Sequence, residues 1–117
     1  MRNTDLTLVL GASLKSERAS WKAVQLLRAK GFEVSAFGLR AGRIADVDIT
    51  TELPELTGVH TVALYLNPTN QLAYYDYIMG LKPERIVFNP GTENLELFRM
   101  AKQAGIDAQY DCTIVLL

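Results

Sequence analysis

The stretch Leu6-Thr7-Leu8-Val9-Leu10-Gly11-Ala12-Ser13 decides the fold of this chain. Its apolar run is typical of a buried strand, and the small residues after it indicate a turn into an amphipathic segment that opens near Ser20. A first strand that turns at a glycine into a helix can bring a phosphate to the helix N-terminus. Gly11 is the only glycine between Met1 and Lys30, so the three-glycine dinucleotide fingerprint is absent.

Short β-rich runs alternate with helical segments along the whole chain. The predicted strands cover residues 6–10, 32–37, 49–51, 60–66, 85–88 and 106–110. The predicted helices run from an N-cap at Ser20 to Gly31, from about Gln71 to Met79 before Gly80, and from the 89–94 loop to Ala104 with a cap at Gly105. Strands separated by such helices indicate βαβ units. The sequence therefore predicts one α/β domain over residues 1–117, with a three-layer, Rossmann-like, doubly wound and mainly parallel sheet.

Composition narrows the class of protein further. The chain has 117 residues, 49% of them hydrophobic and 21% charged, which is ordinary for one soluble globular domain. A net charge of -1 gives no overall field that would attract nucleic acid or an acidic membrane. No apolar run reaches the roughly 20 residues of a membrane span, and Met1–Asp5 carries no signal-peptide core. The single cysteine, Cys112, excludes an intramolecular disulfide, so a cytoplasmic location is expected.

Positive charge is concentrated between residues 11 and 43. This segment holds seven cations against two carboxylates, a net of +5, so the rest of the chain carries -6. We expect Arg28 and Lys30 to be solvated at a helix C-terminus, where cations are favourable. Arg18, Arg40 and Arg43 are predicted to lie in loops. The seven cations are Lys15, Arg18, Lys22, Arg28, Lys30, Arg40 and Arg43.

The candidate ligand site follows from the predicted topology. In a doubly wound sheet, ligands bind outside the carboxyl ends of the strands, near the point where the strand order reverses. Gly11 would let backbone N–H groups approach an anion, Ser13 offers a hydroxyl, and the arginines offer bidentate phosphate contacts. The alternative is that Gly11 only makes a tight turn and Arg18 is a surface charge. The candidate residues are Gly11, Ala12, Ser13, Lys15, Arg18, Ser20, Gly38, Arg40, Asn67, Pro68, Asn89, Pro90 and Gly91.

The end of the second predicted strand bears on which nucleotide would bind. An NAD site places an acidic residue there for the ribose hydroxyls, whereas this chain has Phe37-Gly38-Leu39-Arg40. Glu33 lies at the other end of the strand. An arginine in place of the acid suits a ligand with a phosphate on its adenosine ribose, which both NADP and coenzyme A (CoA) have.

Several segments together resemble a known family. The chain is similar to small stand-alone CoA-binding proteins, which share the Rossmann-like domain of succinyl-CoA ligase α subunits and ADP-forming acyl-CoA synthetases. The resemblance spans about residues 7–116 and implies CoA or acyl-CoA held by Gly11, Ala12, Ser13, Arg18 and the loops after the second and fourth strands. Where members commonly have Asn-Pro and a basic residue, this chain has Gly38-Leu39-Arg40, which keeps the cation. The segments are Gly11-Ala12-Ser13, Glu17-Arg18-Ala19-Ser20, residues 29–34, 89–94 and 95–106, and Asp111-Cys112-Thr113.

Three functions stay open at this point. The first is non-catalytic binding of CoA or an acyl-CoA, with Cys112 either inert or able to form a mixed disulfide with the ligand thiol. The second is an NADP-dependent or other small nucleotide enzyme, and the third is an interaction module without a ligand. His60 is expected to be structural, and the Tyr74–Tyr77 segment to pack mainly in the core. A homodimer through that segment or through residues 113–117 is a further alternative.

Overall fold

The computed structural model describes residues 5–117; the predicted lack of a signal peptide rests partly on residues 1–4, which lie outside this range. A seven-stranded sheet forms the centre of the molecule, in the order β3-β4-β2-β1-β5-β6-β7. All neighbouring strands are parallel except β3 and β4. The strands are β1 (Leu6–Leu10), β2 (Glu33–Phe37), β3 (Gly42–Ile44), β4 (Val47–Thr50), β5 (Val59–Leu64), β6 (Arg85–Phe88) and β7 (Asp107–Tyr110).

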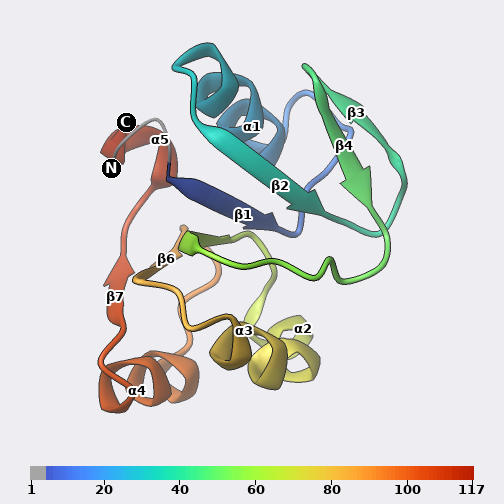
Figure 1. The fold of residues 1–117 in the computed structure, drawn as a ribbon. Helices are drawn as coiled ribbons and strands as arrows, with labels where there is room; N and C mark the ends of the chain where they lie inside the picture. Colours follow the sequence, from blue (N-terminus) through green and yellow to red (C-terminus); the bar gives the residue numbers. More distant parts are fainter. Residues whose placement is uncertain (1–4) are drawn as a thin grey trace.

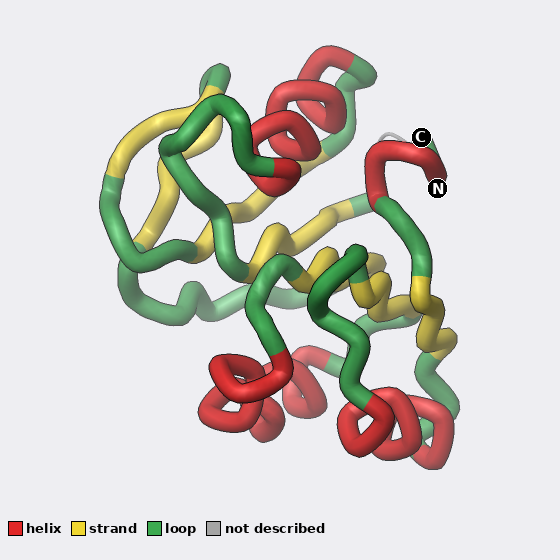
Figure 2. Tube along the Cα trace, turned by 180° about the vertical axis from the view of Figure 1, so that it is seen from behind, coloured by secondary structure: helices red, strands yellow, loops and turns green. Residues whose placement is uncertain are grey.

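Helices cover both faces of the sheet and make three layers (Figures 1 and 2). One face carries α1 (Ala19–Ala29) and α5 (Thr113–Leu116). The other face carries α2 (Pro68–Gln71), the 3₁₀ turn η1 (Leu72–Tyr74), α3 (Tyr75–Leu81) and α4 (Leu95–Gln103). The predicted Rossmann-like, doubly wound architecture is thereby confirmed. None of the helices in the described range is long and apolar enough to cross a membrane.

The quoted stretch of β1 explains why the sheet is buried on both sides. Leu8 and Leu10 face the layer of α3 and α4, whereas Val9 faces α1, and none of the three side chains is exposed. Burial of such a side chain stabilises the fold by about 1.5–3 kcal/mol. Beside β1 the order of the strands reverses: the chain first builds outward through β2 and β4, and then returns to add β5, β6 and β7. The β1–β5 boundary is therefore the place where a ligand crevice is expected.

The predicted third strand was too short, and one strand was missed. In place of a lone strand at 49–51, β3 and β4 form an antiparallel hairpin around Ala45 and Asp46. Ala45 has φ +54°, a conformation usually given to glycine or asparagine, so the usual sequence pattern for the turn is missing. The prediction that Arg43 lies in a loop is therefore wrong, because it lies in β3 and pairs with Asp48.

Three helix boundaries also differ from the prediction. Helix α1 begins at Ala19 with Arg18 as its N-cap, because the Ser20 hydroxyl is turned back toward the preceding loop. The single helix predicted from Gln71 to Met79 is divided into α2, η1 and α3, and Gly80 lies within α3. The carboxyl-terminal tail forms the short helix α5. Gly31 and Gly105 end their helices as predicted, with φ of +84° and +78°.

Candidate functional site

The loop after β1 turns on Gly11, whose φ is +104°. A Cβ at this position would lie 3.0 Å from the carbonyl carbon of Tyr65, so a glycine fits both the angle and the space. The N–H groups of Gly11 and Ala12 donate to the Phe37 carbonyl at 2.9 and 2.8 Å. The sequence had suggested that backbone N–H groups here would approach an anion, but these two amides are bonded to β2 and extend its contact with the loop.

The next residues fold the loop onto the start of α1. The Ser13 N–H donates to Ser20 Oγ at 3.2 Å, and Ser13 Oγ accepts from the Lys15 N–H at 3.1 Å. Ser20 is buried, whereas Ser13 is half-buried. Ser20 therefore shapes the loop, and Ser13 is the hydroxyl nearer to the surface.

The N-terminus of α1 has the features of an anion site. Arg18 occupies the N-cap position and makes no side-chain capping bond, so the first amides of this 11-residue helix have no side-chain acceptor. The aligned peptide dipoles make this end of the helix partially positive. Lys15 and Arg18 are exposed beside it. Together they place positive charge and free N–H groups at one point of the surface.

The loop after β2 lies directly against the loop after β1. Gly38 is buried, and a Cβ on it would collide with the Ala12 carbonyl oxygen. A Cβ on Gly42 would meet the Leu14 side chain at 2.6 Å. Arg40 is exposed between these two contacts, so it lies on a loop adjoining the one that carries Lys15 and Arg18.

The seven cations of the basic segment fall into two groups. Arg28 pairs through two nitrogens with Asp46, both at 2.8 Å, and Arg43 pairs with Asp48 at 2.9 Å. Asp46 raises the pKa of Arg28, and the hydrogen bonds from Arg28 lower the pKa of Asp46. Within residues 5–117 no ion pair with a carboxylate side chain includes the other five, although Lys30 Nζ donates to the Leu117 carbonyl oxygen at 3.1 Å. These five are Lys15, Arg18, Lys22, Lys30 and Arg40.

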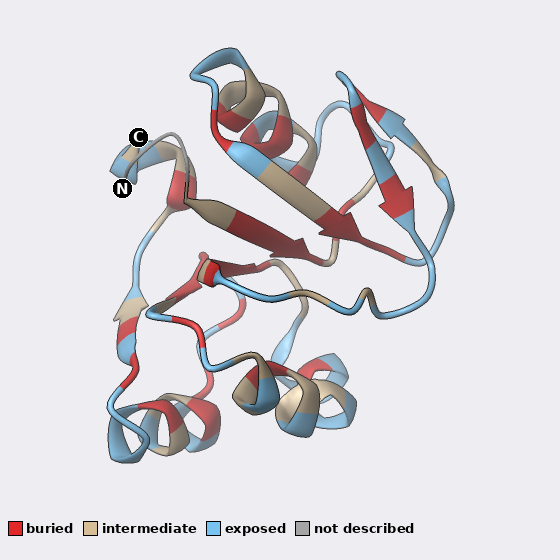
Figure 3. Ribbon diagram, in the orientation of Figure 1, coloured by how far each residue is buried: buried red, intermediate tan, exposed pale blue. Residues whose placement is uncertain are grey.

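Some of the predicted site residues after β5 and β6 are exposed, and one is buried. Asn67 is exposed and caps α2, because its Oδ1 accepts from the Asn70 N–H at 2.9 Å, and Pro68 follows as the first helical residue. Pro90 and Gly91 are also exposed. Figure 3 shows exposed connecting segments next to buried strands, and both loops have exposed residues at their tips, although Asn89, Thr92 and Asn94 of the second loop are buried. Their tips are therefore open to a ligand.

Asn89 is the exception among the predicted residues. It is 1% exposed; its Nδ2 donates to the Leu64 carbonyl at 3.0 Å and its Oδ1 accepts from the Thr113 N–H at 2.8 Å. Its amide group thus joins the end of β5 to the start of α5. The side chain acts as scaffold below the loop and is not open to a ligand.

Sequence reasoning missed three buried polar residues under the same loops: Gln71, Thr92 and Asn94. The stretch Asn67–Gln71 reads as an ordinary polar helix start, and nothing in it marks Gln71 as fully buried. Asn94 could have been found as an N-cap, since it precedes an amphipathic helix and its Oδ1 accepts from the Leu97 N–H. Its second role, a bond to Gln71, depends on tertiary contacts.

The other candidate side chains are tied into the fold. His60 Nε2 lies 3.0 Å from Glu84 at the amino end of β5, opposite the candidate site. Tyr77 donates to the Pro54 carbonyl at 2.5 Å. Burial raises the pKa of Tyr65 to about 12, and Cys112, which is half-buried, lies close enough to affect that pKa. The expectation that His60 is structural agrees with its carboxylate contact.

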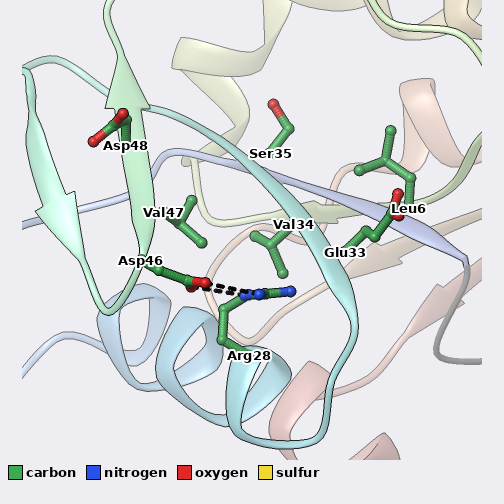
Figure 4. Close-up of a pocket in the computed structure, with 8 residues that line it drawn as sticks. All are labelled: Leu6, Arg28, Glu33, Val34, Ser35, Asp46, Val47 and Asp48. Carbon is green, nitrogen blue, oxygen red and sulfur yellow. Dashed lines mark hydrogen bonds and ion pairs between the residues drawn. The ribbon is translucent and has the colours of Figure 1, made fainter.

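A surface hollow of about 390 Å³ lies at the amino ends of the strands (Figure 4). It is lined by Leu6 and Glu33 at the starts of β1 and β2, by residues 46–48, and by Arg28 from α1. The Arg28–Asp46 bonds shown in the figure pair the one cation among its described lining residues, and Asp48 is paired with Arg43. The hollow therefore offers less free charge than the opposite edge.

The doubly wound sheet places this chain in the class of Rossmann-like domains, in which ligands bind at the carboxyl edge of the sheet. Within that class, a family model described as "CoA binding domain" matches residues 6–117, so the chain belongs to the CoA-binding domain family. Among curated proteins, none matches this chain.

Solved structures are similar over nearly the whole chain. One, titled as the crystal structure of an uncharacterized protein, is 41% identical with a TM-score of 0.93, over 98% of this chain and 95% of the other. A protein from Thermus thermophilus is 18% identical with a TM-score of 0.82, over 96% and 87%. A hypothetical protein from Pyrococcus horikoshii is 21% identical with a TM-score of 0.77, over 97% and 81%. The last two support the fold alone.

Proposed function

We propose that this protein binds coenzyme A or an acyl-CoA without catalysing a reaction on it. The observation that carries the proposal is the group of three exposed cations on two adjoining loops, next to the uncapped N-terminus of α1. Phosphates are favoured at such a helix end, and arginine can contact them in a bidentate way. Membership of the CoA-binding domain family supports the choice of ligand.

The charge along the carboxyl edge supports one orientation of the ligand. Lys15, Arg18 and Arg40 belong to the loops after β1 and β2, whereas residues 65–70 and 89–94 contain no cation. The phosphates of CoA would therefore lie over the first pair of loops. Its uncharged pantetheine arm would extend along Asn67–Pro68 and Pro90–Gly91, whose tips are exposed.

Arg40 is our candidate for the phosphate on the adenosine ribose. It stands two residues beyond Gly38, where an NAD site would have an acidic residue. The Gly38–Ala12 contact holds its loop against the phosphate loop. We assign no catalytic residue, because the sequence's single histidine lies at the amino end of β5, away from this edge.

Isothermal titration of the purified protein with CoA, dephospho-CoA, NADP and NAD tests the proposal. We expect CoA to bind about tenfold or more tighter than dephospho-CoA, since a charge-assisted contact contributes roughly 1.5–3 kcal/mol. Arg40→Ala should remove that difference. Arg43→Ala is the matched control, because it deletes the same charge at a residue already paired with Asp48, and it should preserve the difference.

Two results would contradict the proposal. Binding of NADP with no response to CoA would favour a redox enzyme, and NADPH turnover lost in Arg40→Ala would then locate its site. Absence of binding by all four compounds would favour an interaction module without a ligand.

A further inference from the structure

A buried amide side chain joins the two loops of the candidate site that carry no cation. Gln71, the last residue of α2, is 0% exposed, and its Nε2 donates to the carbonyls of Leu66 and Thr92, both at 2.8 Å. Leu66 immediately precedes Asn67, and Thr92 immediately follows Gly91. One side chain thus sets the spacing between the loop after β5 and the loop after β6.

Asn94 completes this network from the start of α4. Its Nδ2 donates to Gln71 Oε1 at 2.9 Å and to the Tyr75 hydroxyl oxygen at 2.7 Å, while its Oδ1 accepts from the Leu97 N–H at 3.3 Å. Because a backbone N–H can only donate, the Leu97 contact fixes which way the amide faces. Both amide N–H₂ groups of the network therefore have two acceptors each, which makes it rigid and costly to disturb.

We propose that Gln71 and Asn94 are positioning residues, which hold Asn67–Pro68 and Pro90–Gly91 at the separation needed by the pantetheine arm of CoA. The inference rests on the proposed function and adds which part of the ligand these residues serve. Both side chains are at least nine-tenths buried, so they act through the loops above them and do not contact the ligand. Their removal affects the uncharged arm of the ligand and spares its phosphates.

The substitution Asn94→Asp disrupts the hydrogen-bond network but keeps the N-cap of α4. Aspartate is as good an N-cap as asparagine, so the bond to the Leu97 N–H persists. The variant has no Nδ2 to donate, and it places a carboxylate oxygen against Gln71 Oε1. Tyr75→Phe and Tyr77→Phe form a matched pair, because each removes one hydrogen-bonded hydroxyl from α3. Only Tyr75 is joined to Asn94, whereas Tyr77 bonds to Pro54.

The affinities for CoA and for 3′-phosphoadenosine 5′-diphosphate, which lacks the pantetheine arm, measure the effect. We expect Asn94→Asp to weaken CoA about tenfold and the fragment less than about twofold, because only the arm reaches the displaced loops. Tyr75→Phe should show the same selectivity with a smaller loss, and Tyr77→Phe should show none. Equal losses for both ligands, or none for either, would overturn the positioning role.

Amide hydrogen exchange of the ligand-free protein tests, without any ligand, whether the network holds the two loops in place. Exchange at residues 65–67 and 91–93 should accelerate in Asn94→Asp more than in Tyr77→Phe, although the Asn94 side chain forms its hydrogen bonds with Gln71, Tyr75 and Leu97 and not with residues 65–67. Unchanged exchange there would overturn the inference even where CoA binds. Failure of the wild-type protein to bind either CoA or the fragment would instead overturn the proposed function.

Discussion

Within the described residues, the arginines of residues 11–43 are paired at the amino end of the parallel sheet and unpaired at its carboxyl end. At the amino end, Arg28 and Arg43 are paired with Asp46 and Asp48, beside a hollow of about 390 Å³. At the carboxyl end, Lys15, Arg18 and Arg40 have no ion pair in the described range and lie on two loops in tight contact. The comparison teaches that neither the volume of a hollow nor the net charge of a segment is enough to choose a candidate site. We base the candidate site on unpaired cations beside helix N–H groups that have no side-chain acceptor.

The tight contact between the two loops gives the largest expected effect. Gly38→Ala places a Cβ against the Ala12 carbonyl, so the loops must separate. We expect a loss of about 1–3 kcal/mol in the free energy of unfolding, the usual range for overpacking. CoA binding should fall with it, because Arg40 moves away from Lys15 and Arg18. Urea unfolding and titration with CoA measure the two effects.

Gly80→Ala is the matched control for that substitution. Gly80 lies in α3, and a Cβ there would meet nothing within 4 Å. Alanine should therefore stabilise the protein by about 0.5–1 kcal/mol through its better helix propensity. A comparable loss in both variants would mean that Gly38 is not a special point of contact.

A second prediction tests whether the paired and unpaired arginines at the two ends of the sheet differ in their effect on CoA binding. Arg18→Ala should weaken CoA binding about tenfold, in keeping with about 1.4 kcal/mol for one charged contact. Asp46→Ala releases Arg28 from its partner and so creates a free cation at the amino end. It should leave CoA affinity unchanged, since a free cation alone makes no site there. Tighter CoA binding by Asp46→Ala would contradict the placement of the ligand.

The same contrast shows what the sequence could and could not predict. The β1 stretch predicts the central strand and its turn because an apolar run and a glycine are local properties. Which arginines are paired is not local: Arg28 lies 18 residues from Asp46, and the hairpin that brings them together was not predicted. The role of Gln71 was not predicted for the same reason, because its burial depends on non-local contacts with the loops after β5 and β6.

A third prediction concerns the turn that was missed. Ala45→Gly should stabilise the hairpin by about 0.5–1 kcal/mol, because alanine is strained at φ +54° and glycine is not. Ala41→Gly is the control: it makes the same change four residues earlier, where the backbone is not in the left-handed region. That variant should be slightly less stable than the wild type. Thermal unfolding of the two variants compares them directly, and a stability loss in Ala45→Gly would contradict the strain at this turn.

The smallest expected effect is the acid dependence of the Arg28–Asp46 pair. Since Arg28 lowers the pKa of Asp46 in the folded protein, the unfolded chain takes up a proton at this carboxyl first as the pH falls. The stabilisation by the pair is therefore fully present above the ordinary aspartate pKa and is lost as the pH drops through the lowered folded-state value. Asp46→Asn should flatten that part of the plot of urea midpoint against pH, whereas Glu52→Gln, at another exposed carboxyl, should preserve it. Identical slopes in wild type and Asp46→Asn would mean that this exposed pair adds nothing to the free energy of unfolding. The pairing of Arg28 at the amino end would then neutralise its charge without stabilising the fold.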